Sequence, residues 1–185
     1  MNDPARRLWE QTLVLRCQAG DDRAFEELLA AFHGRLKNYV DRVLGNPGNA
    51  DDILQEVWID VYRKLPSLRS PQAIRSWLFR IVRNKNAHHF RRNRIQTESL
   101  EVTDLADQPQ PEPTFGEEDV RAISRCLDRL SPEHREVVVL RFMEDMSYEE
   151  IAQAANCRVG TVRSRLYYAK RALKDEMERL QNDAQ

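Results

Sequence analysis

The chain has 185 residues, of which 41% are hydrophobic and 32% are charged, and its formal net charge is −1. This length accommodates one ordinary domain or two small ones, the apolar content excludes full disorder, and the scarcity of glycine and of alternating β-branched residues excludes an extensive sheet. No apolar run approaches the roughly 18 residues that cross a bilayer, and the first residues lack the apolar core of a signal peptide, so we expect a cytoplasmic, all-α protein without membrane insertion.

The first half of the chain has the periodicity of amphipathic helices. Apolar residues from Phe25 to Val43 recur at three- and four-residue spacing, and Asp21 or Asp22 can cap this helix. The stretch GNPGN at 45–49 ends it. A second helix then carries an acidic first turn, where the helix dipole favours negative charge, and it can be capped by Asn49.

The next helix is strongly basic. We expect it to begin with Ser70 as its cap and Pro71 at its first position, and to bury a stripe made of Ile74, Trp77, Leu78, Ile81 and Val82. Ten basic residues and no acidic one lie between Arg63 and Arg94. Because the arginines are mixed with aromatic and amide side chains, this segment has the composition that single-stranded nucleic acid requires.

A linker follows the basic helix. Residues 95–116 contain three prolines and show no usable periodicity, and the window from Glu98 to Asp119 holds eight acidic residues and no basic one. We expect this segment to be a flexible, acidic linker between two helical domains.

The last part of the chain has the pattern of a helix-turn-helix over 147–174. Ser147 and Glu150 form a capping-box pair, and Asn156 can take a left-handed conformation in the turn before a basic helix. Arg163 and Ser164, one turn into that helix, are expected to reach base edges in the major groove. Phosphate contacts are expected from Arg158, Arg165, Lys170 and Arg171.

The three cysteines indicate no cofactor or metal site. Cys17, Cys126 and Cys157 are far apart and lack the paired spacing of a zinc site or of a disulfide framework. We expect them to be buried small apolar residues.

Taken together, these segments resemble a known family, the group 4 or extracytoplasmic-function (ECF) sigma factors of bacterial RNA polymerase. The resemblance extends from AGDDRAFEELL (19–29) to YYAKRAL (167–173), and its markers are ADDILQEVWIDVY (50–62), RSWLFRIVRN (75–84), LSPEHREVVVLRF (130–142) and SYEEIAQAANCRVGTVRSRL (147–166). It implies a region 2 domain at 8–94, the linker at 95–116 and a region 4 domain at 117–180. It also implies a promoter-specificity subunit rather than an enzyme.

The resemblance implies roles for individual residues. The exposed acidic and amide face of region 2.2, formed by Asp52, Gln55 and Glu56, would bind the clamp helices of the largest subunit of core RNA polymerase, which suits a negative patch. Single-stranded DNA of the −10 element would be bound by Arg69, Arg80, Arg83, Asn84, His88, Arg91 and Arg92. The −35 duplex would be bound by Arg158, Thr161, Arg163, Ser164, Arg165, Tyr167, Tyr168 and Arg171. An anti-sigma factor is the usual regulator in the family.

The sequence departs from the family pattern at three positions. Tyr168 stands where the family often has arginine, Asp145 where it often has glycine, and His88 where it often has aspartate. These departures bear on the choice of promoter rather than on the class of protein.

Two other functions are compatible with parts of the sequence. A dimeric helix-turn-helix regulator of duplex operators would explain 147–174 but would leave the basic helix and the acidic face of 50–62 without a role. A nucleic-acid enzyme could hold magnesium with Asp51, Asp52 and Glu56, but no further carboxylate is arranged to complete such a site. The sigma-factor interpretation therefore leads.

Overall fold

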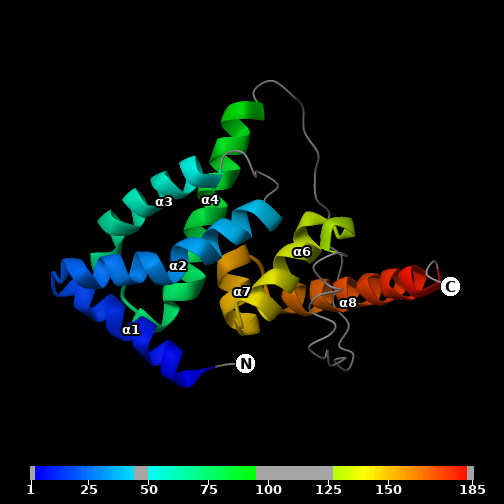
Figure 1. Cartoon of the computed structure of the whole chain (residues 1–185), viewed down its shortest axis with the longest axis horizontal. Coiled ribbons are helices and arrows are strands. Elements are labelled where there is room, and N and C mark those ends of the chain that lie inside the picture. The colour runs from blue at the N-terminus through cyan, green and yellow to red at the C-terminus, as the bar shows by residue number, and fades with distance from the viewer. Residues whose placement is uncertain (1–2, 44–49, 95–126, 183–185) are drawn as a thin grey trace.

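The computed structural model describes residues 3–43, 50–94 and 127–182, without the side chains of 88–94, Asp128 and 176–182. Every regular element within these ranges is helical, which confirms the predicted all-α class (Figure 1). Several predictions lie outside the described residues: the GNPGN stop, the Asn49 cap, the acidic linker at 95–116 and the start of the C-terminal domain at 117.

The first two helices each begin at an aspartate whose side chain caps the helix N-terminus. Helix α1 (Pro4–Gln18) begins where the Asp3 carboxylate accepts hydrogen bonds from the backbone N–H groups of Ala5 and Arg6. The turn after it contains Gly20 with a φ of 88°, a conformation that costs glycine little. Helix α2 (Asp22–Val43) is capped by Asp21, whose Oδ1 accepts from the N–H of Ala24 at 3.2 Å. The predicted cap at 21 or 22 is thus Asp21.

Helices α3 (Ala50–Lys64) and α4 (Ile74–Arg94) follow, joined by the 3-10 turns η1 (Leu65–Ser67) and η2 (Pro71–Ala73). Ser70 is the N-cap residue of η2 and Pro71 its first position, as predicted, but the Ser70 hydroxyl bonds to Gln72 Oε1 at 2.9 Å instead of to a backbone N–H. Near the start of the helix, the backbone N–H groups of Ala73 and Ile74 donate to the carbonyls of Ser70 and Pro71, within the η2 turn. We call α1–α4 the N-terminal group.

The C-terminal group comprises η3 (Leu127–Arg129), α6 (Pro132–Val138), the π-turn η4 (Val139–Met143), α7 (Tyr148–Ala155) and α8 (Val159–Asn182). The predicted capping box at Ser147 and Glu150 is confirmed, and Asn156 has the predicted left-handed conformation, with a φ of 51°. Asp145 also has a positive φ, 53°. The position where the family often has glycine is therefore a left-handed turn here as well.

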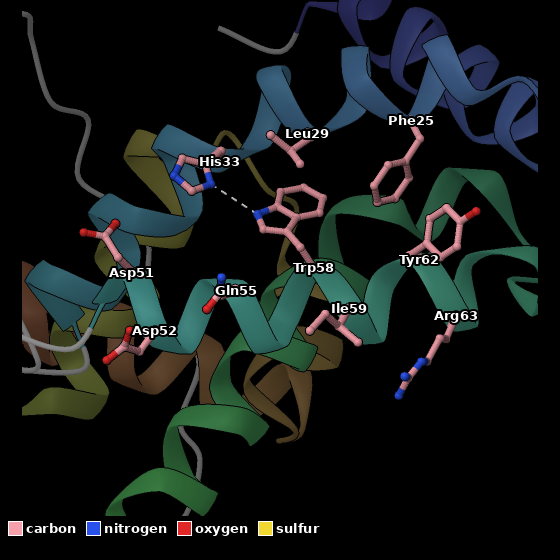
Figure 2. A pocket seen from close by; sticks show the side chains of 10 residues that line it. All are labelled: Phe25, Leu29, His33, Asp51, Asp52, Gln55, Trp58, Ile59, Tyr62 and Arg63. Carbon is pink, nitrogen blue, oxygen red and sulfur yellow. Dashed lines mark hydrogen bonds between the residues drawn. The ribbon is translucent and has the colours of Figure 1, made fainter.

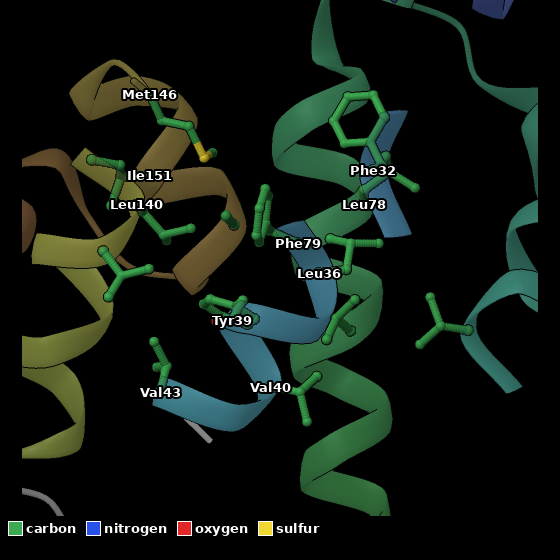
Figure 3. Packing of buried hydrophobic residues seen from close by; sticks show 14 of the residues in the cluster. Phe32, Leu36, Tyr39, Val40, Val43, Leu78, Phe79, Leu140, Met146 and Ile151 are labelled. Carbon is green, nitrogen blue, oxygen red and sulfur yellow. The ribbon is translucent and has the colours of Figure 1, made fainter. Parts of the chain in front are cut away.

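The two groups share one apolar core. Figure 3 shows Tyr39 of α2 and Phe79 of α4 facing Leu140, Met146 and Ile151 of the C-terminal group. All five side chains are almost completely buried, and the rings of Tyr39 and Phe79 meet edge to face at 5.1 Å. In the part of the chain that the structure describes, the two groups therefore pack directly against each other.

This packing changes the predicted core stripe of α4. Ile74, Leu78 and Val82 are buried as predicted, whereas Trp77 and Ile81 are only partly buried. A second face of the same helix is covered by α7, and it buries Arg75, Ser76 and Phe79. The periodicity of a single helix predicts one core face, so the second face was missed.

The cysteine prediction needs a correction. Cys17 and Cys157 are half-buried rather than buried, although burial still raises the pKa of the Cys17 thiol. Cys126 lies outside the described residues.

Candidate polymerase and nucleic-acid interfaces

The outer face of α3 combines charge with an apolar groove. The side chains of Asp52, Gln55 and Glu56 are all exposed on it, as the sequence predicted for one helix face. A groove of about 900 Å³ lies between this face and α2, and Figure 2 shows the side chains that line it. It is lined by Phe25, Leu29, His33, Asp51, Asp52, Gln55, Trp58, Ile59, Tyr62 and Arg63.

The floor of the groove is held in place by aromatic contacts. Trp58 is buried, its indole N–H donates to His33 Nδ1 at 3.2 Å, and Phe25 packs edge to face on both Trp58 and Tyr62. Ile59 and Tyr62 remain 48% and 60% exposed. A fixed floor with two exposed apolar side chains above it is typical of a preformed docking site.

Sequence reasoning missed the apolar part of this site. Ile59 and Tyr62 fall outside the core stripe of their own helix and lie on the same side as Gln55 (Figure 2). Large apolar residues on an otherwise polar helix face are an available signal for a binding surface. The acidic residues were singled out, and the apolar neighbours were not.

Neighbouring basic residues pair with several carboxylates of α3. Lys37 bonds to Asp51 and Lys64 bonds to Asp60, and these hydrogen bonds hold the pKa of both carboxyl groups below their usual values. The Nζ atom of Lys85 on α4 lies 3.4 Å from Oε2 of Glu56. Such exposed pairs contribute little to stability and can be exchanged for a partner's charges.

The basic residues of α4 divide between two faces. Arg80 and Asn84 are exposed on the outer face, and Arg69 is exposed in the loop that precedes the helix. Arg83 faces the C-terminal group, where its Nε lies 3.0 Å from Glu136 Oε1. His88, Arg91 and Arg92 belong to the same helix, but their side chains lie outside the described residues.

Arg75, which belongs to the basic segment but not to the predicted DNA-binding set, is buried. It is 4% exposed, and its Nε donates to Glu10 Oε2 at 2.6 Å. Its charge is therefore used inside the protein rather than on the surface.

The outer face of α8 presents a row of basic and aromatic side chains. Arg158, just before the helix, and Arg163, Tyr167, Tyr168 and Arg171 within it are exposed, whereas Thr161, Ser164 and Arg165 are half-buried. The opposite face packs Val162, Leu166, Ala169 and Leu173 into the core, as predicted.

One predicted phosphate contact is wrong. Lys170 is 7% exposed, and its ammonium group lies over the ring of Phe142 at 5.7 Å. It serves the packing of α8 on η4 instead.

His134 of α6 is a neighbour of this row that the sequence did not reveal. Its ring lies 6.3 Å from that of Tyr168, which in turn meets Tyr167 edge to face at 5.4 Å. Burial lowers the pKa of His134, and Arg165 acts in the same direction. The imidazole is therefore held toward its neutral form beside the aromatic pair.

Comparison with known proteins identifies the family. The family model for sigma-70 region 2 matches residues 28–95, and the model for sigma-70 region 4 matches residues 120–173. The ECF RNA polymerase sigma-E factor of Escherichia coli K12 is 33% identical, over 95% of this chain and 98% of that protein. The chain belongs to the ECF sigma factors. A second relative, the RNA polymerase sigma-H factor of Pseudomonas aeruginosa, is 32% identical over 95% of this chain and 97% of its own.

Solved structures support the same fold. This sigma factor resembles CnrH in its complex with the cytosolic domain of CnrY, with a TM-score of 0.63, 24% identity, and coverage of 92% of this chain and 97% of that one. It resembles equally the sigma factor RpoE bound to the anti-sigma factor NepR from Bartonella quintana, with a TM-score of 0.63, 22% identity, and coverage of 83% and 96%.

The family assignment decides between the functions that the sequence left open. The protein is an RNA polymerase sigma factor, a DNA-binding factor for transcription initiation. The operator-binding regulator is not favoured, because the region 2 match covers the helices that such a regulator would leave without a role. Within the described ranges, none of the helices is long and apolar enough to span a membrane.

Proposed function

We propose that this sigma factor binds core RNA polymerase through the face of α3 and recognises promoter DNA through α4 and α8. The proposed domains are 8–94 for polymerase and −10 recognition and 117–180 for −35 recognition, joined by the linker at 95–116. The observation that carries the proposal is the preformed groove of α3, in which acidic, amide and apolar side chains meet on one exposed face.

The groove suits the clamp helices of the largest polymerase subunit. Asp52, Gln55 and Glu56 offer carboxylate and amide groups to a basic helix pair, while Ile59 and Tyr62 offer apolar anchors beside them. Charged groups around an apolar centre give an interface its orientation and its affinity, respectively.

The −10 element is proposed to bind along the outer face of α4 as a single strand. Arg69 and Arg80 would contact phosphates and Asn84 a base edge, because all three side chains are exposed. Arg83, His88, Arg91 and Arg92 complete the proposed set.

The −35 element is proposed to bind α8 as a duplex. Arg163 and Ser164 lie in the second turn of the recognition helix, where side chains reach base edges in the major groove. Arg158, Thr161, Arg165, Tyr167, Tyr168 and Arg171 surround them and would contact phosphates, sugars and thymine methyl groups.

The proposed function also includes a protein regulator and excludes catalysis by the chain itself. An anti-sigma factor is proposed as a partner, because one structural neighbour is a sigma factor bound to an anti-sigma factor. The chain is proposed to act in the cytoplasm without catalytic activity of its own and without a cofactor.

Polymerase binding can be tested with the double variant Asp52→Lys and Glu56→Lys. Two exposed carboxylates at i and i+4 become ammonium groups, so attraction to a basic partner becomes repulsion and retention on immobilised core polymerase is expected to fall at least about tenfold. The matched control is Asp22→Lys and Glu26→Lys, the same change at the same spacing on the exposed side of α2. Equal retention of both variants would remove the α3 face from the interface.

A further inference from the structure

Tyr168 on the outer face of α8 is held by two other aromatic rings. The ring of Tyr167 meets it edge to face at 5.4 Å, and the ring of His134 on α6 lies 6.3 Å away at an interplanar angle of 31°. Both separations fall within the range in which aromatic rings attract each other. Tyr168 is nevertheless 54% exposed, so its ring is supported by the protein and still open to a partner.

The position of His134 is fixed by the start of α6. Ser131 caps this helix, and its hydroxyl oxygen accepts a hydrogen bond from the backbone N–H of His134 at 3.4 Å. The next residue, Arg135, donates from Nη1 to the Arg42 carbonyl at 3.0 Å and from Nη2 to the Leu130 carbonyl at 3.3 Å. Helix α6 itself packs against α8 (Figure 1). The imidazole therefore projects from a backbone that is anchored at this residue and at the next.

The inner face of α8 fixes the direction in which Tyr168 points. Leu166 and Ala169, which lie on either side of it in the sequence, are almost completely buried, so the helix cannot rotate about its axis without exposing them. Ser164 precedes Tyr168 by four residues, one helical turn, and residues at this spacing share a helix face. Tyr168 therefore lies one turn further along the surface that is proposed to read the −35 duplex.

The chemistry of tyrosine restricts what Tyr168 can recognise. Arginine, which the family often has at this position, can bind guanine through two hydrogen bonds, and tyrosine lacks the paired donors for that contact. The tyrosine ring offers an apolar surface, and the apolar group that a base pair presents in the major groove is the C5-methyl group of thymine. A ring that is already held in one orientation loses less conformational entropy on making this contact than a freely rotating one.

We propose that Tyr168 recognises the C5-methyl group of one thymine in the −35 duplex and that His134 is the positioning residue that holds its ring for this contact. The inference deepens the proposed function and rests on it, because it requires α8 to lie in the major groove of the −35 element. Burial lowers the pKa of His134, so the imidazole is held toward its neutral form, which suits a ring that packs against another ring.

The test replaces thymine by deoxyuridine, which removes only the C5-methyl group and keeps every hydrogen-bonding group of the base pair. The full-length chain is assembled with core polymerase, and the DNA is a promoter that this holoenzyme transcribes, found by run-off transcription of genomic fragments. Each thymine of its −35 element, on either strand, is replaced singly. The uracil penalty is defined as the dissociation constant with the replacement divided by the dissociation constant without it.

Four variants separate positioning from packing. His134→Ala removes the ring, His134→Leu restores apolar volume without a flat ring, and His134→Phe restores a ring of similar size. Tyr168→Ala removes the proposed contact with the methyl group itself. Circular dichroism and thermal unfolding check that each variant is folded before its holoenzyme is assembled.

The expected result is one thymine at which the parent holoenzyme shows a uracil penalty of about three- to fivefold, the value of one buried methyl group. Tyr168→Ala should abolish this penalty. His134→Ala and His134→Leu should reduce the penalty to less than about twofold and weaken binding of the unmodified promoter about three- to tenfold, because the Tyr168 ring must then be ordered during binding. His134→Phe should keep the full penalty.

Three outcomes overturn the inference. The first is a −35 element that the holoenzyme reads although no thymine in it shows a uracil penalty, including an element without any A·T pair. The second is a penalty that survives in Tyr168→Ala. The third is a full penalty in folded His134→Ala, or a rescue by leucine as complete as the rescue by phenylalanine, either of which would show that the ring of His134 does not position Tyr168.

Failure of the proposed function has a different signature. Either no holoenzyme would form, or its binding would be insensitive to full base-pair substitutions in the −35 element as well as to deoxyuridine. If only the inference about Tyr168 and His134 fails, base-pair substitutions in the −35 element still weaken binding.

Discussion

At the scale of single residues, the side chains of this sigma factor act according to the face on which they lie. Arg75, Arg80 and Arg83 lie within nine positions of one helix, yet the first is buried on Glu10, the second is exposed and the third is paired with Glu136. The charge of the segment was evident from the sequence. The different roles come from the rotation of about 100° between successive helical residues, which places neighbours on different surfaces.

Arg163 provides the test of base recognition. Arg163→Ala is expected to cost about 1–3 kcal/mol of binding at one or two −35 positions, the value of a lost bidentate base contact. The measurement is holoenzyme binding to promoters with single −35 substitutions, since the loss should disappear where the contacted base is already changed. Arg158→Ala is the comparison, because a phosphate contact should weaken all promoters equally. A uniform loss for Arg163→Ala would make it a phosphate contact too.

Leu78 provides the test of packing. It is fully buried in α4, so Leu78→Ala is expected to lower the free energy of unfolding by about 2–5 kcal/mol through lost burial and the cavity left behind. Urea denaturation followed by circular dichroism measures the change. Leu15→Ala makes the same substitution at a site that is 55% exposed on α1, and it should change stability far less. Equal losses would contradict the assigned core face.

At the scale of elements, the helix-turn-helix depends on a residue far away in the chain. The capping box of α7 is a local feature, and Ser147 and Glu150 alone predicted it correctly. Arg7 then binds the same carboxylate from α1, a contact that spans most of the chain. Local sequence determines how α7 begins, and a long-range contact determines how it is oriented.

The ionisation of Glu150 predicts a pH dependence. Burial opposes its charge, but hydrogen bonds from Arg7 and from the Ser147 N–H outweigh that effect and hold its pKa below the ordinary value of 4.5. A carboxyl group with a lowered pKa in the folded state stabilises the protein above pH 4.5, and that contribution is lost as the pH falls through the folded pKa. Acid is therefore expected to weaken the attachment of α7 to α1.

Glu150→Gln should flatten the acid side of the stability profile between about pH 5 and pH 3, because the amide keeps the capping role of this position but does not titrate. Urea unfolding at stepped pH measures this. Glu144→Gln is an informative contrast, since burial raises the pKa of Glu144 despite Arg35. A group with a raised pKa loses stabilisation as the pH rises, so this substitution should change the profile in the opposite sense. If the free energy of unfolding depended on pH with the same slope in both variants, the opposite pKa shifts assigned to Glu150 and Glu144 would be contradicted.

At the scale of the whole molecule, one continuous core joins the two helical groups. Phe79 and Tyr39 are packed against Leu140, Met146 and Ile151, and ion pairs surround this apolar centre (Figure 3). The groove on α3, the outer face of α4 and the row on α8 remain accessible around it. The packing of the two groups therefore leaves the proposed polymerase site accessible while it pairs Arg83 with Glu136.

The sequence by itself determined the helical class, the capping box of α7, the left-handed turn at Asn156, the apolar side of α8 and the family. The first four depend on residues close together in the chain, where periodicity and backbone preferences act directly, and the family follows from the resemblance of the ordered motifs between residues 19 and 173. The tertiary structure alone decided that Arg75 and Phe79 are buried, that Lys170 packs on Phe142, that Ile59 and Tyr62 border a groove, and that Arg83 is held by Glu136. The physical reason is that burial and pairing depend on which helices lie against a residue. A helix can be covered by neighbours on two faces, whereas the apolar periodicity of its own sequence predicts only one buried face.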